Sequence, residues 1–145
     1  MSTNKRVSVL GGGSFGTVLA NIAASNGYEV CLWVRDAEQA LRINSEGANS
    51  TYHPELQLSE NITASEDLTS AVKNSDYILV ATPSNIFEEV ISRLEPLISS
   101  SVAVISCTKG VKSDPFRTMT DIINQHLGDL IGKKFGVLSG PNLAK

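Results

Sequence analysis

Three glycines near the start of the chain, Gly11, Gly13 and Gly16, are spaced as G-x-G-x-x-G. Glycine lacks a Cβ, so Gly11 can adopt a tight turn and Gly13 leaves room for a phosphate beside the main chain. Gly16 allows a helix to pack closely against the preceding strand. The first N–H groups of that helix have no intrahelical partner and lie at the positive end of its dipole, where they attract phosphates. The spacing therefore predicts a site for the pyrophosphate of a dinucleotide.

A cation, Arg35, stands where an NAD-specific site usually has an acidic residue, about twenty residues after the glycines, to bind the ribose 2′-hydroxyl. Asp36 follows it and suits the N-cap of a helix. A guanidinium can pair with a 2′-phosphate through two hydrogen bonds or stack on adenine. Although Arg35 could be an ordinary surface arginine, its position favours NADP, or tolerance of both NADP and NAD.

A second cation, Lys109, follows an apolar run and precedes Gly110. A lysine at the ligand edge of a sheet can meet an anionic substrate, or stabilise an oxygen that gains charge as a hydride moves. An ordinary exposed loop lysine is the other interpretation. Residues 139–142 are either a turn that ends a strand or a cradle beside a nicotinamide. Thr82-Pro83-Ser84 is interpreted as a strand end, with Ser84 as the N-cap of the next helix.

Alternating strands and helices must position these residues. We expect strands over residues 7–10, 29–34, 62–64, 76–81, 102–106 and 134–139, and helices over 17–24, 37–43, 67–73, 85–94 and 116–127. The alternation predicts an α/β fold, Rossmann-like and doubly wound, with a mainly parallel sheet and helices on both faces. Ligands of such sheets bind beyond the carboxyl ends of the strands, and every candidate segment above falls at such an end.

Two local features accompany this pattern. Asp36 with Gln39 three residues later fits a capping box at the start of the second helix. The polar stretch 44–61, which contains Tyr52, is long for a loop in a compact domain, and such loops are usually functional or mobile.

Composition narrows the class of protein. The chain has 145 residues, of which 41% are hydrophobic and 19% charged, with a net charge of −3. This balance fits one globular domain and argues against nucleic-acid binding, which needs clustered excess Lys and Arg. No apolar run could span a bilayer and no signal segment precedes the first strand, so we expect a cytoplasmic location.

The cysteines and histidines indicate no metal site. Cys31 and Cys107 lie far apart, each within an apolar strand pattern, and are interpreted as buried free thiols. His53 and His126 belong to no Cys/His cluster. We therefore expect no bound metal.

Five segments occur together and in order: Gly-Gly-Gly-Ser-Phe-Gly-Thr (11–17), Leu-Trp-Val-Arg-Asp (32–36), Thr-Pro-Ser (82–84), Thr-Lys-Gly (108–110) and Leu-Ser-Gly-Pro-Asn-Leu-Ala-Lys (138–145). With them the chain resembles the bacterial NAD(P)-dependent glycerol-3-phosphate dehydrogenases along essentially its whole length. The Thr-Lys-Gly and Ser-Gly-Pro pair is much more specific than the glycine motif. The resemblance implies a cytoplasmic oxidoreductase that interconverts dihydroxyacetone phosphate and sn-glycerol 3-phosphate for phospholipid biosynthesis.

The resemblance also implies roles for single residues. Ser14 and Phe15 would contact the cofactor from the glycine turn, while Arg35 and Tyr52 would lie near the adenosine. Lys109 would contact both the cofactor and the small phosphorylated substrate.

Three further positions near the chain end receive roles in the same way. Gly140 and Asn142 would help to hold the substrate, and Ala144 would contact the cofactor. Asn142 departs from the Ser or Thr of many bacterial members, so its contact would be made by an amide.

The family has a C-terminal helical domain that carries the proton-transferring lysine and most ligands of the substrate phosphate. Residues 1–145 end before it. We therefore expect 1–145 to be the NAD(P)-binding domain, with no catalytic residue of its own and no turnover. A homo-oligomer would form through the helical domain.

Two other functions fit the residues. A stand-alone NAD(P)-sensing regulatory domain fits the length of 145 residues. A related dehydrogenase acting on a hydroxy acid or a sugar acid would use the same fold.

Overall fold

The structure is a computed structural model that describes residues 5–139. The elements in chain order are β1 (Arg6–Leu10), α1 (Ser14–Ser25), β2 (Glu29–Trp33), α2 (Ala37–Glu46), β3 (Ile62–Ser65), α3 (Leu68–Val72), β4 (Tyr77–Val80), α4 (Ser84–Ser92), the 3-10 helix η1 (Glu95–Leu97), β5 (Ala103–Ser106), β6 (Val111–Ser113), β7 (Phe116–Thr118), α5 (Met119–Ile131) and β8 (Phe135–Val137).

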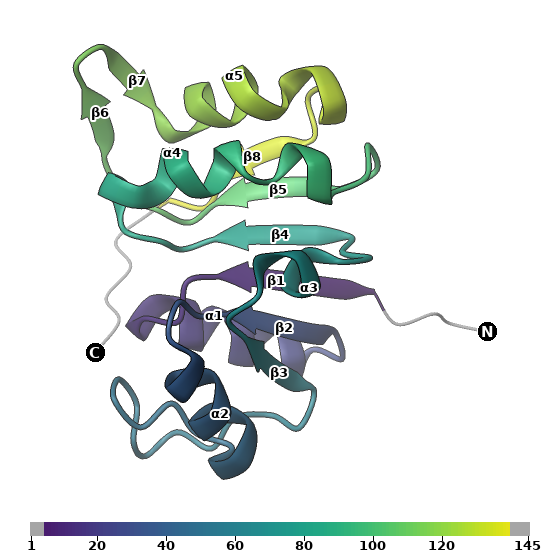
Figure 1. The fold of residues 1–145 in the computed structure, drawn as a ribbon, viewed down its shortest axis with the longest axis vertical. Helices are drawn as coiled ribbons and strands as arrows, with labels where there is room; N and C mark the ends of the chain where they lie inside the picture. Colours follow the sequence, from purple (N-terminus) through teal and green to yellow (C-terminus); the bar gives the residue numbers. More distant parts are fainter. Residues whose placement is uncertain (1–4, 140–145) are drawn as a thin grey trace.

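Six strands form one parallel sheet in the order β3-β2-β1-β4-β5-β8 (Figure 1). The chain winds outward from β1 to β3, then crosses to β4 on the other side of β1. This reversal creates a switch point between β1 and β4, the place where open α/β sheets bind their ligands. The predicted Rossmann-like, doubly wound fold is confirmed.

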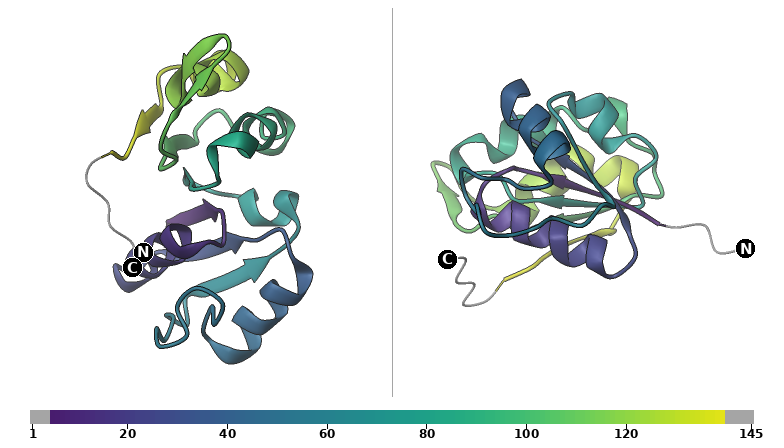
Figure 2. Two further views of the ribbon diagram at one scale, coloured as in Figure 1. Left: turned by 90° about the vertical axis from the view of Figure 1, so that its left-hand side faces the viewer. Right: turned by 90° about the horizontal axis from the view of Figure 1, so that it is seen from below.

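Two hydrophobic cores lie on opposite faces of the sheet because successive strand residues point to opposite sides. One core joins Ile78 and Val80 of β4 to the buried sides of α3, α4 and α5. The other joins Val7 and Val9 of β1 to α1 and α2. Figures 1 and 2 show α4 and α5 on the face opposite to α1.

A hairpin that the sequence analysis missed lies between β5 and α5. The helix predicted over residues 116–127 begins only at Met119, because Phe116–Thr118 is instead strand β7, paired antiparallel with β6. In the sequence Phe116 fits the spacing of apolar residues in a helix. In the structure it is 71% exposed, so it does not belong to a buried helical face. The hairpin projects from the same end of the sheet as the carboxyl ends of the strands (Figure 1).

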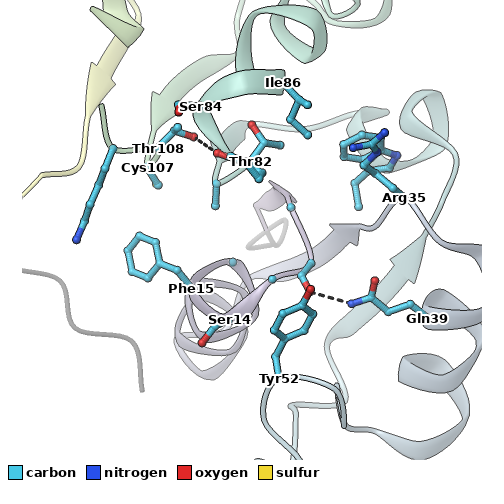
Figure 3. Close-up of a pocket in the computed structure, with 18 residues that line it drawn as sticks. Ser14, Phe15, Arg35, Gln39, Tyr52, Thr82, Ser84, Ile86, Cys107 and Thr108 are labelled. Carbon is cyan, nitrogen blue, oxygen red and sulfur yellow. Dashed lines mark hydrogen bonds between the residues drawn. The ribbon is translucent and has the colours of Figure 1, made fainter. Parts of the chain in front are cut away.

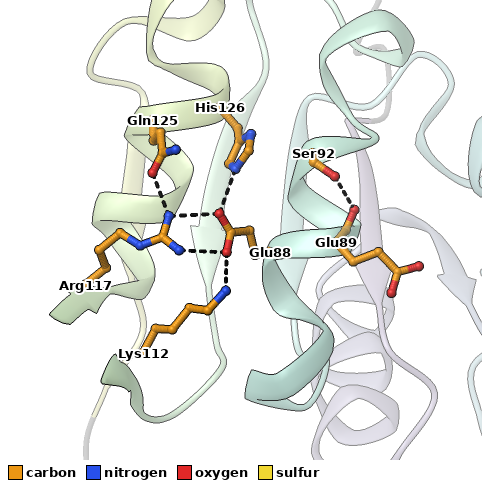
Figure 4. A network of polar contacts seen from close by, with 7 residues as sticks. All are labelled: Glu88, Glu89, Ser92, Lys112, Arg117, Gln125 and His126. Atoms are coloured by element: carbon orange, nitrogen blue, oxygen red, sulfur yellow. Dashed lines mark hydrogen bonds and ion pairs between the residues drawn. The ribbon is translucent and has the colours of Figure 1, made fainter. Parts of the chain in front are cut away.

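The hairpin is tied to α4 by one carboxylate, Glu88. It accepts hydrogen bonds from both terminal nitrogens of Arg117 at 2.8 Å, from Lys112 Nζ at 2.5 Å and from His126 Nε2 at 3.1 Å (Figure 4). These hydrogen bonds, that of Arg117 foremost, hold the pKa of Glu88 far below its usual range. Glu88 therefore joins α4, the hairpin and α5 while remaining ionised.

Two predicted helix starts are wrong in detail. The side chain of Asp36 does cap α2, but it accepts from Glu38 N, and Gln39 bonds elsewhere instead of completing a capping box. Ser84 is the first residue of α4, whose N-cap is Pro83 with no side-chain hydrogen bond. Helix α2 also runs on to Glu46, so the polar loop begins at residue 47.

Both cysteines are buried free thiols, as predicted. Burial raises the pKa of the Cys107 thiol to about 11, and burial also raises the pKa of Cys31. No helix among the described residues is long and apolar enough to cross a membrane.

Candidate functional site

A cavity of about 650 Å³ opens at the carboxyl ends of the strands (Figure 3). It is lined by the predicted cofactor residues Gly11, Gly13, Ser14, Phe15, Gly16, Arg35 and Lys109. These residues follow β1, β2 and β5, so the sheet brings together three segments that are far apart in sequence. The cavity volume suits a ligand larger than a single phosphate group.

The glycine turn between β1 and α1 is packed so tightly that a Cβ would meet backbone atoms at the first and third glycines of the motif. Gly11 has a φ of +124°, a conformation that L residues rarely adopt, and a Cβ there would lie 2.6 Å from Ala81 O. A Cβ on Gly16 would lie 1.9 Å from Gly11 O. The first and third glycines therefore serve the close packing of the turn, α1 and β4.

The middle glycine differs from its neighbours. A Cβ on Gly13 would have no atom within 4 Å, although Gly13 lines the cavity. The protein itself does not require glycine here, whereas a ligand lying against the main chain would. Gly13 is also the N-cap of α1, with no side-chain cap and no acidic residue in the first turn.

The opposite wall is built from the ends of β4 and β5. Thr108 Oγ1 is 2.7 Å from Thr82 O and 3.2 Å from Val80 O, and donates across the two strand ends. Thr82 lines the cavity, and its Oγ1, which is buried, has no hydrogen-bond partner among the described residues. A buried hydroxyl without a partner costs free energy unless a ligand or water satisfies it.

Lys109 follows Thr108 and is exposed on the rim of the cavity. Gly110 after it has a φ of +111°, so the backbone turns there in a conformation that favours glycine. This turn leads the chain from β5 into the hairpin. Lys109 therefore lies at the junction of the cavity and the hairpin.

The far end of the cavity contains Arg35 and Tyr52. Figure 3 shows Arg35 on the opposite side of the view from Cys107 and Thr108. Arg35 is exposed two residues after the end of β2 and lines the cavity together with Trp33, whose Nε1 donates to Glu66 O at 3.0 Å. Tyr52 reaches the cavity from the long loop, 47% exposed.

Three predicted residues, Gly140, Asn142 and Ala144, lie outside the described residues 5–139. Sequence reasoning placed Thr82 at the ligand edge without giving it a binding role, and it missed Gln39 as a cavity residue. Thr82 carried a usable signal, since it follows a strand at the ligand edge. The contacts of Gln39 gave no such signal, because they depend on tertiary structure.

Within residues 5–139 no three His, Cys, Asp or Glu side chains gather as metal ligands do. The described residues do fit a dinucleotide: an uncapped helix N-terminus, a glycine with open space beside it and a threonine whose buried hydroxyl has no partner belong to residues that line one cavity. Backbone N–H groups and hydroxyls are donors, which suit phosphate and ribose oxygens.

Fold and site together define a Rossmann-type α/β domain of the dinucleotide-binding class. Residues 6–145 match the family described as NAD-dependent glycerol-3-phosphate dehydrogenase N-terminus. The chain belongs to this family.

Curated relatives carry the same family name. The chain is 48% identical over 143 residues to the NAD(P)+ glycerol-3-phosphate dehydrogenase of Acinetobacter baumannii, covering 99% of this chain and 39% of that protein. The enzyme of Teredinibacter turnerae is 42% identical over 145 residues, which are 100% of this chain and 42% of that protein. The chain thus spans about two fifths of the length of the curated relatives it matches.

Solved structures agree. The glycerol-3-phosphate dehydrogenase of Coxiella burnetii superimposes with a TM-score of 0.86 at 32% identity, over 97% of this chain and 42% of that one. A ketopantoate reductase from Ralstonia eutropha has a TM-score of 0.67 at 21% identity, over 91% of this chain and 39% of that one, so it shares the fold.

Proposed function

We propose that this chain is the cofactor-binding part of a glycerol-3-phosphate dehydrogenase that uses NADP or NAD. The full enzyme would transfer a hydride between the nicotinamide and dihydroxyacetone phosphate or sn-glycerol 3-phosphate. The observation that carries the proposal is the uncapped N-terminus of α1 at Gly13, which lines the cavity beside open space. The names of the curated relatives support both the cofactor and the reaction.

Different residues along the cavity bind different parts of the cofactor. Main-chain N–H groups of Gly13 and Ser14 bind the pyrophosphate at the positive end of the α1 dipole. Phe15 packs against the cofactor, and Arg35 pairs with a 2′-phosphate or stacks on adenine beside Tyr52. When bound, the nicotinamide cofactor supplies or accepts the hydride.

The substrate end of the cavity is assigned to Lys109. Its ammonium group stabilises the substrate oxygen that gains negative charge, and it attracts the substrate phosphate. Gly140 and Asn142 help to hold the substrate, and Ala144 contacts the cofactor.

The remaining steps belong to other parts of the enzyme. A helical domain following this chain supplies the proton-transferring lysine, most ligands of the substrate phosphate and the surface of a homo-oligomer. The enzyme acts in the cytoplasm and feeds phospholipid biosynthesis.

The proposal is tested by titrating the 145-residue chain with NADPH and NADH by isothermal calorimetry. We expect both to bind, with no turnover of dihydroxyacetone phosphate. The substitution Arg35→Ala should weaken NADPH about tenfold or more, because a charged hydrogen-bond pair to the 2′-phosphate is lost, and should weaken NADH less.

Two results would contradict parts of the proposal. Failure of the folded chain to bind either cofactor would rule out the cofactor-binding role. Equal weakening of NADPH and NADH by Arg35→Ala would show that Arg35 does not recognise the 2′-phosphate. The substitution Arg42→Ala on the exposed side of α2 is a matched control for the loss of one cation, because Arg42 does not line the cavity.

A further inference from the structure

A buried group of side-chain amides and a hydroxyl lies beside the glycine turn. It consists of Gln39 from α2, Asn49 from the loop after α2, and Thr17 from α1. Asn49 is 2% exposed and Thr17 is 0% exposed. The great majority of buried polar side chains are hydrogen-bonded, and the partners of these three residues fix their positions in the fold.

Both amides donate to one backbone oxygen, Gly12 O. Gln39 Nε2 is 2.8 Å and Asn49 Nδ2 is 2.9 Å from it (Figure 3 shows the Gln39 bond). The amides also bind each other, with Gln39 Nε2 3.2 Å from Asn49 Oδ1. The carbonyl of Gly12 is therefore held by two donors that are themselves held in place.

The hydroxyl extends the group to the next carbonyl. Thr17 Oγ1 accepts from Asn49 Nδ2 at 2.8 Å and donates to Gly13 O at 2.7 Å. Thr17 N also donates to Gly13 O, at 3.1 Å. Two consecutive carbonyls of the glycine turn, those of Gly12 and Gly13, thus point toward protein donors.

The orientation of these carbonyls sets that of the adjoining N–H groups. In a trans peptide the C=O and the following N–H point in opposite directions. The only cis peptide among the described residues is Asp114-Pro115, so both glycine peptides are trans. The N–H groups of Gly13 and Ser14 accordingly point away from the carbonyl donors, and both residues line the cavity.

The same loop reaches the first residue of α1. His53 Nε2 is 2.9 Å from Ser14 Oγ and 3.0 Å from Ser14 O. The loop from residue 47 to 61 therefore touches the glycine turn at Gly12 through Asn49 and at Ser14 through His53. These contacts account for the length of the loop, which supports the glycine turn from outside the sheet.

We propose that Gln39 and Asn49 are positioning residues for dinucleotide binding, which fix the Gly12–Gly13 peptide with its N–H toward the pyrophosphate. The inference rests on the proposed cofactor-binding function. Without the two amides this peptide can rotate and turn the Gly12 carbonyl toward the cavity, where it repels phosphate oxygens. The amides act on the phosphates through the backbone and leave recognition of adenosine unchanged.

The test is the substitution Gln39→Met, which keeps the length of the side chain and removes its donors. We expect the Kd of the 145-residue chain for NADH and ADP-ribose to rise about tenfold, because the hydrogen bonds of Gln39 to Gly12 O and to Asn49 Oδ1 are lost. The Kd for adenosine, which has no phosphate, should stay within twofold. Leu41→Ala on the exposed side of the same helix is the matched control and should leave all three Kd values unchanged.

A second pair of variants keeps the test decisive if Gln39→Met fails to fold. Thr17→Val removes the buried hydroxyl at constant volume and should weaken NADH, whereas Thr17→Ser keeps the hydroxyl and should restore binding. The inference is overturned if folded Gln39→Met and Thr17→Val bind ADP-ribose like the wild type, or if adenosine weakens as much as ADP-ribose. Failure of the wild-type chain to bind NADH would instead overturn the proposed function.

Discussion

The α-helices in the described part of the chain begin in two different ways. Helices α2, α3 and α5 are capped by their own side chains: Asp36 accepts from Glu38 N, Asp67 from Thr69 N and Ser70 N, and Thr118 forms a capping box with Asp121. Helices α1 and α4 begin at Gly13 and Pro83 with no side-chain cap. The two uncapped starts both line the large cavity.

We expect the two kinds of helix start to serve different ends: a capped start stabilises its helix, and an uncapped start leaves N–H groups for a ligand. A side-chain cap satisfies N–H groups that would otherwise lack a partner and stabilises a helix by about 1 kcal/mol. At α1 no side chain occupies the first N–H groups, so they stay available to an anionic ligand. Both uncapped starts lie at the carboxyl edge of the sheet, and that of α4, at Pro83, lies outside the glycine motif.

The largest expected effect comes from giving α1 a cap. In Gly13→Asp the carboxylate can accept from the N–H groups of the first turn, and the space beside Gly13 is open. We expect the chain to be stabilised by about 0.3 kcal/mol while the Kd for NADPH rises about a hundredfold or more, because the carboxylate both occupies the donors and repels phosphate. Calorimetric titration and thermal unfolding of the same samples measure the two effects.

Gly13→Ala is the control for the side-chain atom alone. It adds a Cβ without charge, so binding should weaken less than in Gly13→Asp, and stability should fall by about 0.5 kcal/mol because alanine is a poorer N-cap residue than glycine. If Gly13→Asp binds NADPH as tightly as the wild type, α1 is not the phosphate-binding helix, and the division between the two kinds of helix start has no functional meaning.

The sequence pattern located this functional edge well because it is encoded locally. Gly11 follows β1 directly, Gly16 lies in the first turn of α1, and Arg35 comes two residues after β2. Parallel strands bring their carboxyl ends to one edge. The pattern therefore predicted the sheet and placed these residues at a common edge. Their binding roles remain predictions.

The features that sequence reasoning missed depend on contacts between distant segments. The strands of the β6–β7 hairpin have three residues each, and those of β6 are all exposed, so they lack the apolar alternation of a half-buried strand. Gln39 was assigned to a capping box three residues after Asp36, but its amide instead reaches Gly12, 27 residues away. A side chain that bonds to a residue far away in the sequence, and not to its neighbours, leaves no periodic pattern in the sequence.

Helix α4 sharpens the comparison because it lacks a cap yet is anchored elsewhere, through Glu88. The substitution Glu88→Gln removes the charge that holds Arg117 and Lys112, and it should destabilise the chain by about 1–2 kcal/mol at neutral pH. Binding of NADH should change little, since Glu88 does not line the large cavity. Glu89→Gln on the same helix is the control, because the Glu89 carboxylate points away from the cluster (Figure 4).

The pH dependence of this difference has a definite sign. The folded-state pKa of Glu88 lies below the unfolded value of about 4.3, so its contribution is fully present above that pH. It is lost as the pH falls through the folded pKa. The gap in unfolding free energy between wild type and Glu88→Gln, measured in urea, should shrink as the pH falls below about 4. A gap that widens as the pH is lowered further below about 4 would contradict the assignment of Glu88 as an ionised anchor.

The smallest expected effect comes from removing a cap that serves stability only. Thr118 Oγ1 accepts from Asp121 N at 3.1 Å, and Thr118 N donates to Asp121 Oδ2 at 2.8 Å, which closes the start of α5. Thr118→Ala should cost about 1 kcal/mol and lower the melting temperature by about 2–5 °C, while Thr118→Ser should retain most of the stability. The Kd for NADPH should stay within twofold, because the α5 start does not line the large cavity. A tenfold loss of binding in the folded Thr118→Ala chain would show that capped helix starts also support the ligand, and that the two kinds of start are not functionally distinct.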